Sequence, residues 1–154
     1  MAYRILALAS CVLVVGCATG GSGLRTFDSY TSRPTTCSGP CDIGVKPSCF
    51  FSCGGKVEYD PINVTKQNVV ITWNLPEGYA FCRNRGDGVF LKSEVSDQFD
   101  PDPSNGEGQP CKSWFKLKDK NLLPRPDMPY DYRVVFTRLS DGAPHTIDPS
   151  FINR

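Results

Sequence analysis

Four cysteines lie close together in the segment CSGPCDIGVKPSCFFSC, residues 37–53. This spacing has three chemical interpretations: thiolate ligands of a metal, a redox-active dithiol, or disulfide bonds. Structural zinc sites usually use C-x2-C pairs, and catalytic dithiols usually use C-x-x-C at a helix start, whereas these cysteines form two C-x3-C pairs. Disulfides are therefore the favoured interpretation, on the condition that the chain enters an oxidising compartment.

The first residues of the chain, MAYRILALASCVLVVGCATGGSG, indicate that compartment. Arg4 precedes a nearly unbroken apolar run over 5–16. This run is too short for a membrane-spanning helix, which needs about 20 residues. It has the length of the apolar region of a secretory signal peptide, typically about 7–15 residues. The sequence therefore predicts export, with a signal peptide over 1–16.

The end of the apolar run, Val14-Val15-Gly16-Cys17, resembles the lipobox of bacterial lipoproteins. The resemblance covers residues 1–18. It implies that Cys17 becomes the first residue of the mature chain and carries the acyl groups, palmitate among them. Ala18, where an Asp would signal retention in the inner membrane, implies attachment to the outer membrane, facing the periplasm. A second such motif ends at Cys11, but its apolar region is only six residues long, so we prefer Cys17.

Six cysteines remain after Cys11 leaves with the signal peptide and Cys17 is lipidated. An even number of cysteines in an exported chain predicts a framework of disulfides, here three. Spacing alone does not choose among the possible pairings, and we expect a nested arrangement in which two bonds hold an irregular loop. The expected pairs are Cys37–Cys53, Cys41–Cys49 and Cys82–Cys111.

Short strands separated by turns dominate the rest of the chain. Thirteen prolines and fourteen glycines argue against long helices, and no segment shows a sustained helical period. The clearest strand is NVVITWNL, 68–75, in which apolar residues alternate. The other expected strands are 56–59, 79–83, 88–95, 111–118, 130–139 and the closing HTIDPSFI. The pattern predicts an all-β protein, a small antiparallel β-sandwich of Ig-like architecture, as one domain over 37–154 after a lipidated flexible tether over 17–36.

The segments ITWNLP and DPSFIN, with an aromatic-rich strand between them, loosely resemble small uncharacterised exported β-domains of proteobacteria. This resemblance implies no function. The charge of the chain is more informative about partners. The sequence has 17 basic and 16 acidic residues, and loss of Arg4 with the signal peptide leaves a mature chain that is close to neutral. Such a balance excludes the basic surface that nucleic acids require.

Two candidate sites lie in the second half of the chain. The loop DQFDPDPSNGEG, 97–108, concentrates oxygen ligands that suit calcium, although it does not match an EF-hand, and a solvated loop without metal is the favoured interpretation. Its weak candidates are Asp97, Asp100, Asp102, Asn105 and Glu107. Trp114 and Phe115 are adjacent on a predicted strand, so they must face opposite sides. Either the cysteine-rich loop covers the outer ring, which we favour, or that ring is free to contact a partner.

Catalysis has little support in the sequence. His145 is the one histidine, and no G-x-S-x-G or comparable nucleophile motif accompanies it. We therefore expect a protein that is not an enzyme and needs no cofactor. The favoured function is a non-catalytic binding or structural module of the cell envelope, anchored through Cys17, with an envelope protein or the cell wall as partner. The alternatives are a small envelope hydrolase or carbohydrate-active protein, and a calcium-dependent binding protein using the loop 97–107.

Overall fold

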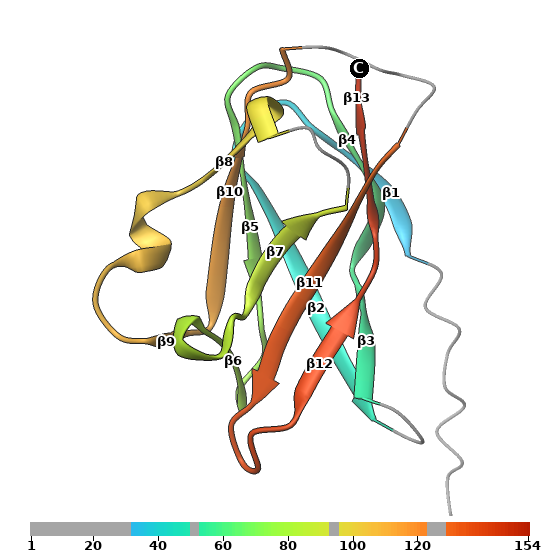
Figure 1. The fold of residues 1–154 in the computed structure, drawn as a ribbon. Helices are drawn as coiled ribbons and strands as arrows, with labels where there is room; N and C mark the ends of the chain where they lie inside the picture. Colours follow the sequence, from blue (N-terminus) through green and yellow to red (C-terminus); the bar gives the residue numbers. More distant parts are fainter. Residues whose placement is uncertain (1–31, 50–52, 93–95, 123–128) are drawn as a thin grey trace, which may run out of the picture. The chain divides into compact units, whose positions relative to one another are not determined.

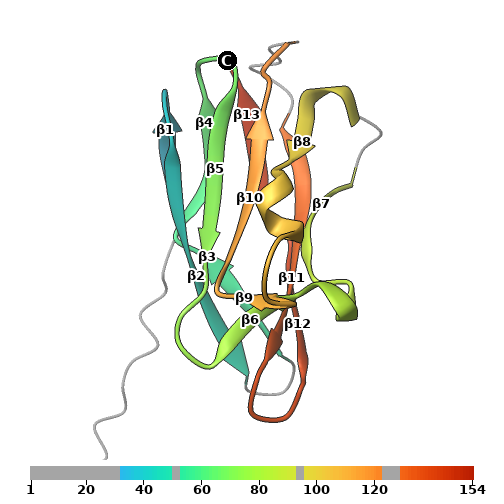
Figure 2. The same cartoon turned by 90° about the vertical axis from the view of Figure 1, so that its left-hand side faces the viewer.

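The computed structural model describes residues 32–49, 53–92, 96–122 and 129–154, which form an all-β domain of two mixed sheets. The signal peptide, Cys17 and most of the predicted tether lie outside these residues. In Figure 1, β8 and β10 of one sheet lie to the left of β11 and β13 of the other, and Figure 2 gives the view at right angles. The all-β, two-sheet prediction is confirmed.

The first sheet follows the order β1-β4-β13-β11-β6-β9, and β7 and β12 also pair with β11. Its strands are β1 (Arg33–Cys37), β4 (Tyr59–Val64), β6 (Tyr79–Cys82), β7 (Gly88–Leu91), β9 (Cys111–Lys112), β11 (Tyr130–Arg138), β12 (Pro144–Ile147) and β13 (Ser150–Asn153). The strand β4 runs parallel to both of its neighbours, β1 and β13.

The second sheet follows the order β3-β2-β5-β10-β8. Its strands are β2 (Cys41–Cys49), β3 (Cys53–Val57), β5 (Val69–Asn74), β8 (Phe99–Pro101) and β10 (Trp114–Asp119). Three short 3₁₀ helices, η1 (Arg83–Arg85), η2 (Ser96–Gln98) and η3 (Pro103–Gly106), complete the regular structure of the described ranges. Because β2 and β5 are also parallel, the sheets are mixed, whereas we expected antiparallel ones. The Ig-like strand arrangement stays a prediction.

The alternating apolar residues of the sequence form the interface between the sheets. In β5, Val69, Ile71 and Trp73 are buried, as the pattern of 68–75 predicts. In β11 the same holds for Tyr130, Tyr132, Val134 and Phe136. The Trp73 ring lies 5.5 Å from the Tyr132 ring and 5.8 Å from the Phe151 ring of the opposite sheet, in edge-to-face contacts. These aromatic contacts hold the two sheets together, since each such pair adds about 0.5–1.5 kcal/mol beyond area burial.

The cysteine-rich segment differs from the irregular loop that we expected. Residues 41–44 pair with β5, and residues 45–49 pair with β3. Ile43 and Val45 are both buried, and this alternation gives β2 one face toward the core. The first sheet begins at Arg33, so residues 33–36 of the predicted tether are part of β1.

The described residues contain three disulfides, but the nested pairing is wrong. The bonds are Cys37–Cys41, Cys49–Cys53 and Cys82–Cys111, of which only the last matches our prediction. Cys49 and Cys53 are opposite each other in the β2/β3 ladder, which brings their Cα atoms to 4.2 Å. Cys37 ends β1 in one sheet and Cys41 begins β2 in the other, so their bond links the two sheets.

One end of the domain contains a buried polar cluster, formed by Asp119, Asn121 and Asn153, each at most 3% exposed. The Oδ1 atom of Asp119 accepts hydrogen bonds from the Asn121 backbone N–H at 2.8 Å and from the Asn153 amide at 3.2 Å. The remaining side-chain oxygen of each residue has no hydrogen-bond partner in the described protein. Burial raises the pKa of Asp119 to about 6, and its two hydrogen bonds oppose this shift.

Candidate functional site

A groove of about 330 Å³ lies between β10 and the segment that contains η3. We call it the Trp114 groove. The residues that define it are Phe81, Arg83, Asp102, Lys112, Trp114 and Phe115. Its volume is within the range of small-ligand and side-chain pockets, about 300–1,000 Å³. It brings together both predicted partner-binding aromatics and part of the acidic loop.

The two aromatic residues of β10 line the groove from different sides of the strand. Phe115 points toward the core and packs on Phe81, with ring centroids 5.6 Å apart. Trp114 points outward, where the ammonium groups of Lys112 and Lys116 lie 4.5 Å and 4.9 Å from its ring centroid. Both aromatic side chains are half-buried, so the predicted alternation holds. Lysine ammonium groups contact the outer ring, and β5 separates β10 from β2 in the sheet, so cover by the cysteine-rich segment stays a prediction.

The helix η3 is fixed to β10 by side-chain hydrogen bonds. Asn105 donates from Nδ2 to the Lys116 carbonyl at 2.7 Å, and its Oδ1 accepts from the Lys116 N–H at 2.8 Å. Asp102 caps η3 by accepting from the Ser104 N–H at 2.9 Å. The hydrogen bonds from Ser104, first from its side chain and then from its backbone, lower the pKa of Asp102. The wall of the groove is therefore preorganised.

The predicted calcium ligands have other partners in this arrangement. Asp100 forms an ion pair with Lys120 at 2.9 Å, Asp102 caps η3, and Asn105 binds β10. Asp97 lies in η2, and Glu107 is exposed just after η3. Within the described ranges, the one group of three or more His, Cys, Asp or Glu residues close enough to share an ion is Cys49, Cys53 and His145. Calcium binding by the loop stays a prediction.

The groove is lined by two cations, Arg83 and Lys112, and by two carboxylates, Asp87 and Asp102. Arg83 donates from Nη1 to the Gly106 carbonyl, and Lys112 donates to the Ser104 carbonyl. Neither cation belongs to any of the four ion pairs found among the described residues. Arg83 and Lys112 flank the disulfide Cys82–Cys111, which brings β6 and β9 together. Neither cation was predicted as a site residue from the sequence, although the predicted Cys82–Cys111 bond could have indicated that both are next to one disulfide.

Comparisons with known proteins do not assign the chain to a family. No protein-family model matches the chain, and no curated protein matches it either. In the part of the chain that the structure describes, no helix has the length and apolar character needed to cross a membrane.

Proposed function

We propose that this protein is a lipoprotein of the bacterial cell envelope, anchored to the outer membrane through acylated Cys17, and that its domain is a non-catalytic binding module facing the periplasm. The signal sequence and the lipobox-like Val14–Cys17 support the anchor. Three disulfides support an oxidising compartment, where such bonds persist.

The Trp114 groove carries the binding part of this proposal. It combines a half-buried tryptophan with an apolar floor and two cations, Arg83 and Lys112, beside the carboxylates of Asp87 and Asp102. Tryptophan and arginine are enriched among the residues that dominate binding energy at interfaces. The two cations can bind a carboxylate-bearing segment of an envelope protein or of the cell wall. We therefore place an anionic segment of the partner against Trp114, Arg83 and Lys112.

The contacts of His145 differ from those of the catalytic histidine in a hydrolase. A hydrolase of the Ser-His-Asp type needs a histidine between a nucleophile and a carboxylate. The His145 ring instead contacts the Gly54 carbonyl at 3.0 Å and the Cys49 sulfur at 3.4 Å. Phe136 and Tyr79 pack against the same ring. Among the described residues, the contacts of this ring with a carbonyl, a sulfur and two aromatic rings support the non-catalytic proposal.

The anchor is tested by fractionation and intact mass of the full chain. The wild-type protein should be found in the membrane fraction, start at Cys17 and carry acyl groups. Cys17→Ser should move it to the soluble fraction or leave it unprocessed, whereas the matched variant Cys11→Ser should behave as wild type. Acylation that survives Cys17→Ser would overturn the anchor assignment without affecting the groove.

The groove is tested by covalent capture in the envelope. A photoreactive residue at position 114 should cross-link one defined partner, and the same residue at the exposed Leu139 should not. Lys112→Glu should reduce capture from position 114 by about tenfold, because it reverses a charge that faces the partner. Equal capture from both positions, unaffected by Lys112→Glu, would overturn the groove as the binding site.

A further inference from the structure

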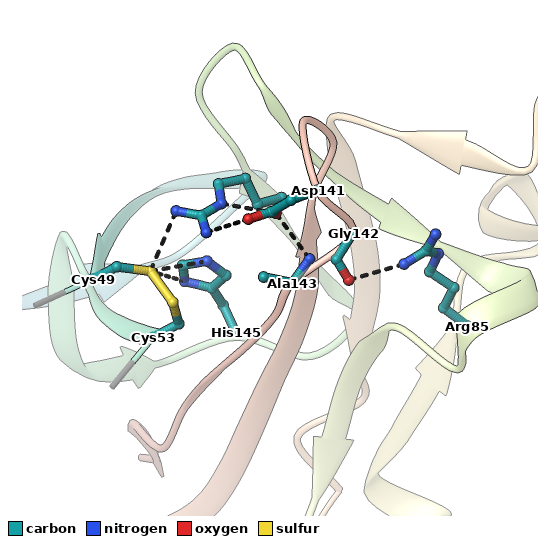
Figure 3. Close-up of polar contacts among 8 residues, drawn as sticks. Cys49, Cys53, Arg85, Asp141, Gly142, Ala143 and His145 are labelled. Carbon is teal, nitrogen blue, oxygen red and sulfur yellow. Dashed lines mark hydrogen bonds and ion pairs between the residues drawn. A yellow bond between two sulfur atoms is a disulfide. The ribbon is translucent and has the colours of Figure 1, made fainter. Parts of the chain in front are cut away.

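The disulfide Cys49–Cys53 lies in a cluster of polar side chains that comes from four strands (Figure 3). Cys49 ends β2, Cys53 begins β3, Arg138 ends β11, and His145 lies in β12. The Cys49 sulfur is 3.4 Å from His145 Nε2 and 3.7 Å from Arg138 Nη1. One sulfur of this disulfide therefore contacts both an imidazole nitrogen and a guanidinium.

The hydrogen bond at the far side of the His145 ring fixes which nitrogen faces the sulfur. Nδ1 lies 3.0 Å from the Gly54 carbonyl oxygen, which can only accept. Nδ1 therefore carries the hydrogen, and in the neutral ring the lone pair is on Nε2. The ring is fully buried and stacks on Phe136 at 5.1 Å. In its neutral form this ring therefore directs the lone pair of Nε2 at Cys49.

Arg138 supplies positive charge at the same sulfur. Asp141 binds it through Nε at 2.9 Å and Nη2 at 2.5 Å, which leaves Nη1 directed at Cys49. This pair lowers the pKa of Asp141 to about 2. Arg85 donates a hydrogen bond to the Gly142 carbonyl at 2.9 Å and so holds the turn that contains Asp141 (Figure 3). The guanidinium is therefore held in place rather than free to move away from the sulfur.

Access distinguishes this disulfide from the other two. Among the six bonded cysteines, Cys49 is the one whose residue is exposed. Cys37 and Cys82 are buried at 2% and 1% exposure, so each of the other disulfides has one inaccessible sulfur. A sulfur must be reachable by the attacking thiolate for exchange to occur.

We propose that Cys49–Cys53 is a thiol–disulfide exchange site whose partner is a cystine, or the corresponding dithiol, of another polypeptide. Cys49 is the sulfur that bonds to the partner. His145 Nε2 is the proton acceptor for its thiol, and Arg138 stabilises its thiolate. Cationic neighbours favour the thiolate, which is the nucleophile in exchange. This proposal is independent of the Trp114 groove.

The exchange is balanced in electrons and protons. In the reduced protein, Nε2 takes the proton of Cys49, and the thiolate attacks one sulfur of the partner cystine. The other partner sulfur leaves and receives that proton. Cys53 then attacks the Cys49 sulfur of the mixed disulfide, which restores Cys49–Cys53 and releases the first partner sulfur as a thiol with the proton of Cys53. Two electrons pass to the partner, and the reverse sequence oxidises a partner dithiol.

The first test compares the three disulfides within one protein. The full oxidised chain is equilibrated in glutathione buffers of increasing reducing power, quenched in acid and alkylated, and each cysteine is quantified by peptide mass. Cys49–Cys53 should be half-reduced at a ratio of reduced to oxidised glutathione at least about tenfold lower than either other bond requires. Opening of all three bonds together, or of Cys49–Cys53 last, would overturn the proposal.

Surface variants separate the charge from the fold. Arg138→Gln should slow alkylation of the reduced Cys49 near pH 6 by about tenfold, because it removes the cation beside the thiolate. Asp141→Asn keeps the cation but removes the ion pair that holds it at the sulfur, so alkylation should slow by less than in Arg138→Gln. Arg133→Gln, on the same strand, is the matched control. Equal slowing in Arg138→Gln and Arg133→Gln, or no slowing in Arg138→Gln, would overturn the proposal.

A zinc-binding measurement tests whether these residues form a metal site instead of an exchange site. Cys49, Cys53 and His145 offer three ligand atoms that lie within 4.8 Å of one another. If one equivalent of zinc(II) protects both thiols of the reduced protein from alkylation in the presence of competing glutathione, the exchange role is overturned and the three residues are a metal site. If zinc(II) gives no protection, exchange stands on the two preceding measurements.

Discussion

Replacement of Asp119 by Asn should stabilise the domain at neutral pH. The carboxylate is completely buried, and its pKa rises from 3.8 to about 6. One pKa unit corresponds to about 1.4 kcal/mol, so the ionised group costs the folded state about 3 kcal/mol at pH 7. An Asn side chain keeps the oxygen that accepts from the Asn121 N–H and carries no charge. Its new N–H donors can cost about 1 kcal/mol if they find no acceptor. The expected net gain is about 2 kcal/mol.

The pH dependence of this gain is more diagnostic than its size. Because the pKa of Asp119 is higher in the folded state than in the unfolded state, the folded protein binds more protons between the two values. The wild-type free energy of unfolding should therefore fall, relative to that of Asp119→Asn, as pH rises from about 4 to about 6. Below pH 4 both states of the wild type are protonated, and the advantage of the variant should disappear.

Urea unfolding with the disulfides intact, followed by tryptophan fluorescence at several pH values, measures both quantities. Asp100→Asn is the matched control, since Asp100 is exposed and pairs with Lys120 on the surface, where an ion pair contributes less than about 1 kcal/mol. The reasoning is refuted if the difference between wild type and Asp119→Asn is the same at pH 3.5 and pH 7, or if the wild type gains on the variant over this interval.

Two further changes test the core and the groove. Tyr132→Phe removes the oxygen that accepts from the Trp73 indole N–H at 3.4 Å, and the buried N–H left without an acceptor should lower the free energy of unfolding by about 1–3 kcal/mol in urea. An unchanged value would show that this contact is not a stabilising hydrogen bond. Asn105→Ala removes both hydrogen bonds to the Lys116 backbone, so the Lys116 amide should exchange its hydrogen faster, by nuclear magnetic resonance, while amides of β11 keep their protection. Equal exchange rates of the Lys116 amide in wild type and Asn105→Ala would show that Asn105 does not fix η3 to β10.

The strand pattern of the sequence predicted much of the fold because burial follows the two-residue period of a strand. Val69, Ile71 and Trp73 could be assigned to one face of β5 before their neighbours were known. The strand β2 was missed, since only Ile43 and Val45 mark its buried face between closely spaced cysteines. The segment forms a strand because its backbone pairs with β5 and with β3. The pattern of residues 41–49 alone does not indicate either of these partners.

The candidate sites were predictable only in part, for a similar reason. Trp114 and Phe115 share a strand, so their opposite directions follow from local geometry. The contact between Cys49 and His145 joins residues 96 positions apart, and it depends on β12 lying beside β3. The disulfide prediction failed for the same reason: Cys49 and Cys53 are opposite each other in the β2/β3 ladder, which the sequence pattern did not reveal, and Cys37 is then bonded to Cys41.

The parallel pairing of β1 and β13 with β4 determines how the domain bears mechanical load. Arg33 begins β1 beside Tyr59 at the start of β4, and Asn153 ends β13 beside Val64 at the end of β4. A pulling force applied between these two ends therefore runs along the three strands and loads their backbone hydrogen bonds in shear. The bonds must then break together rather than one after another as in a zipper, so the domain resists stretching between these points without any disulfide spanning them.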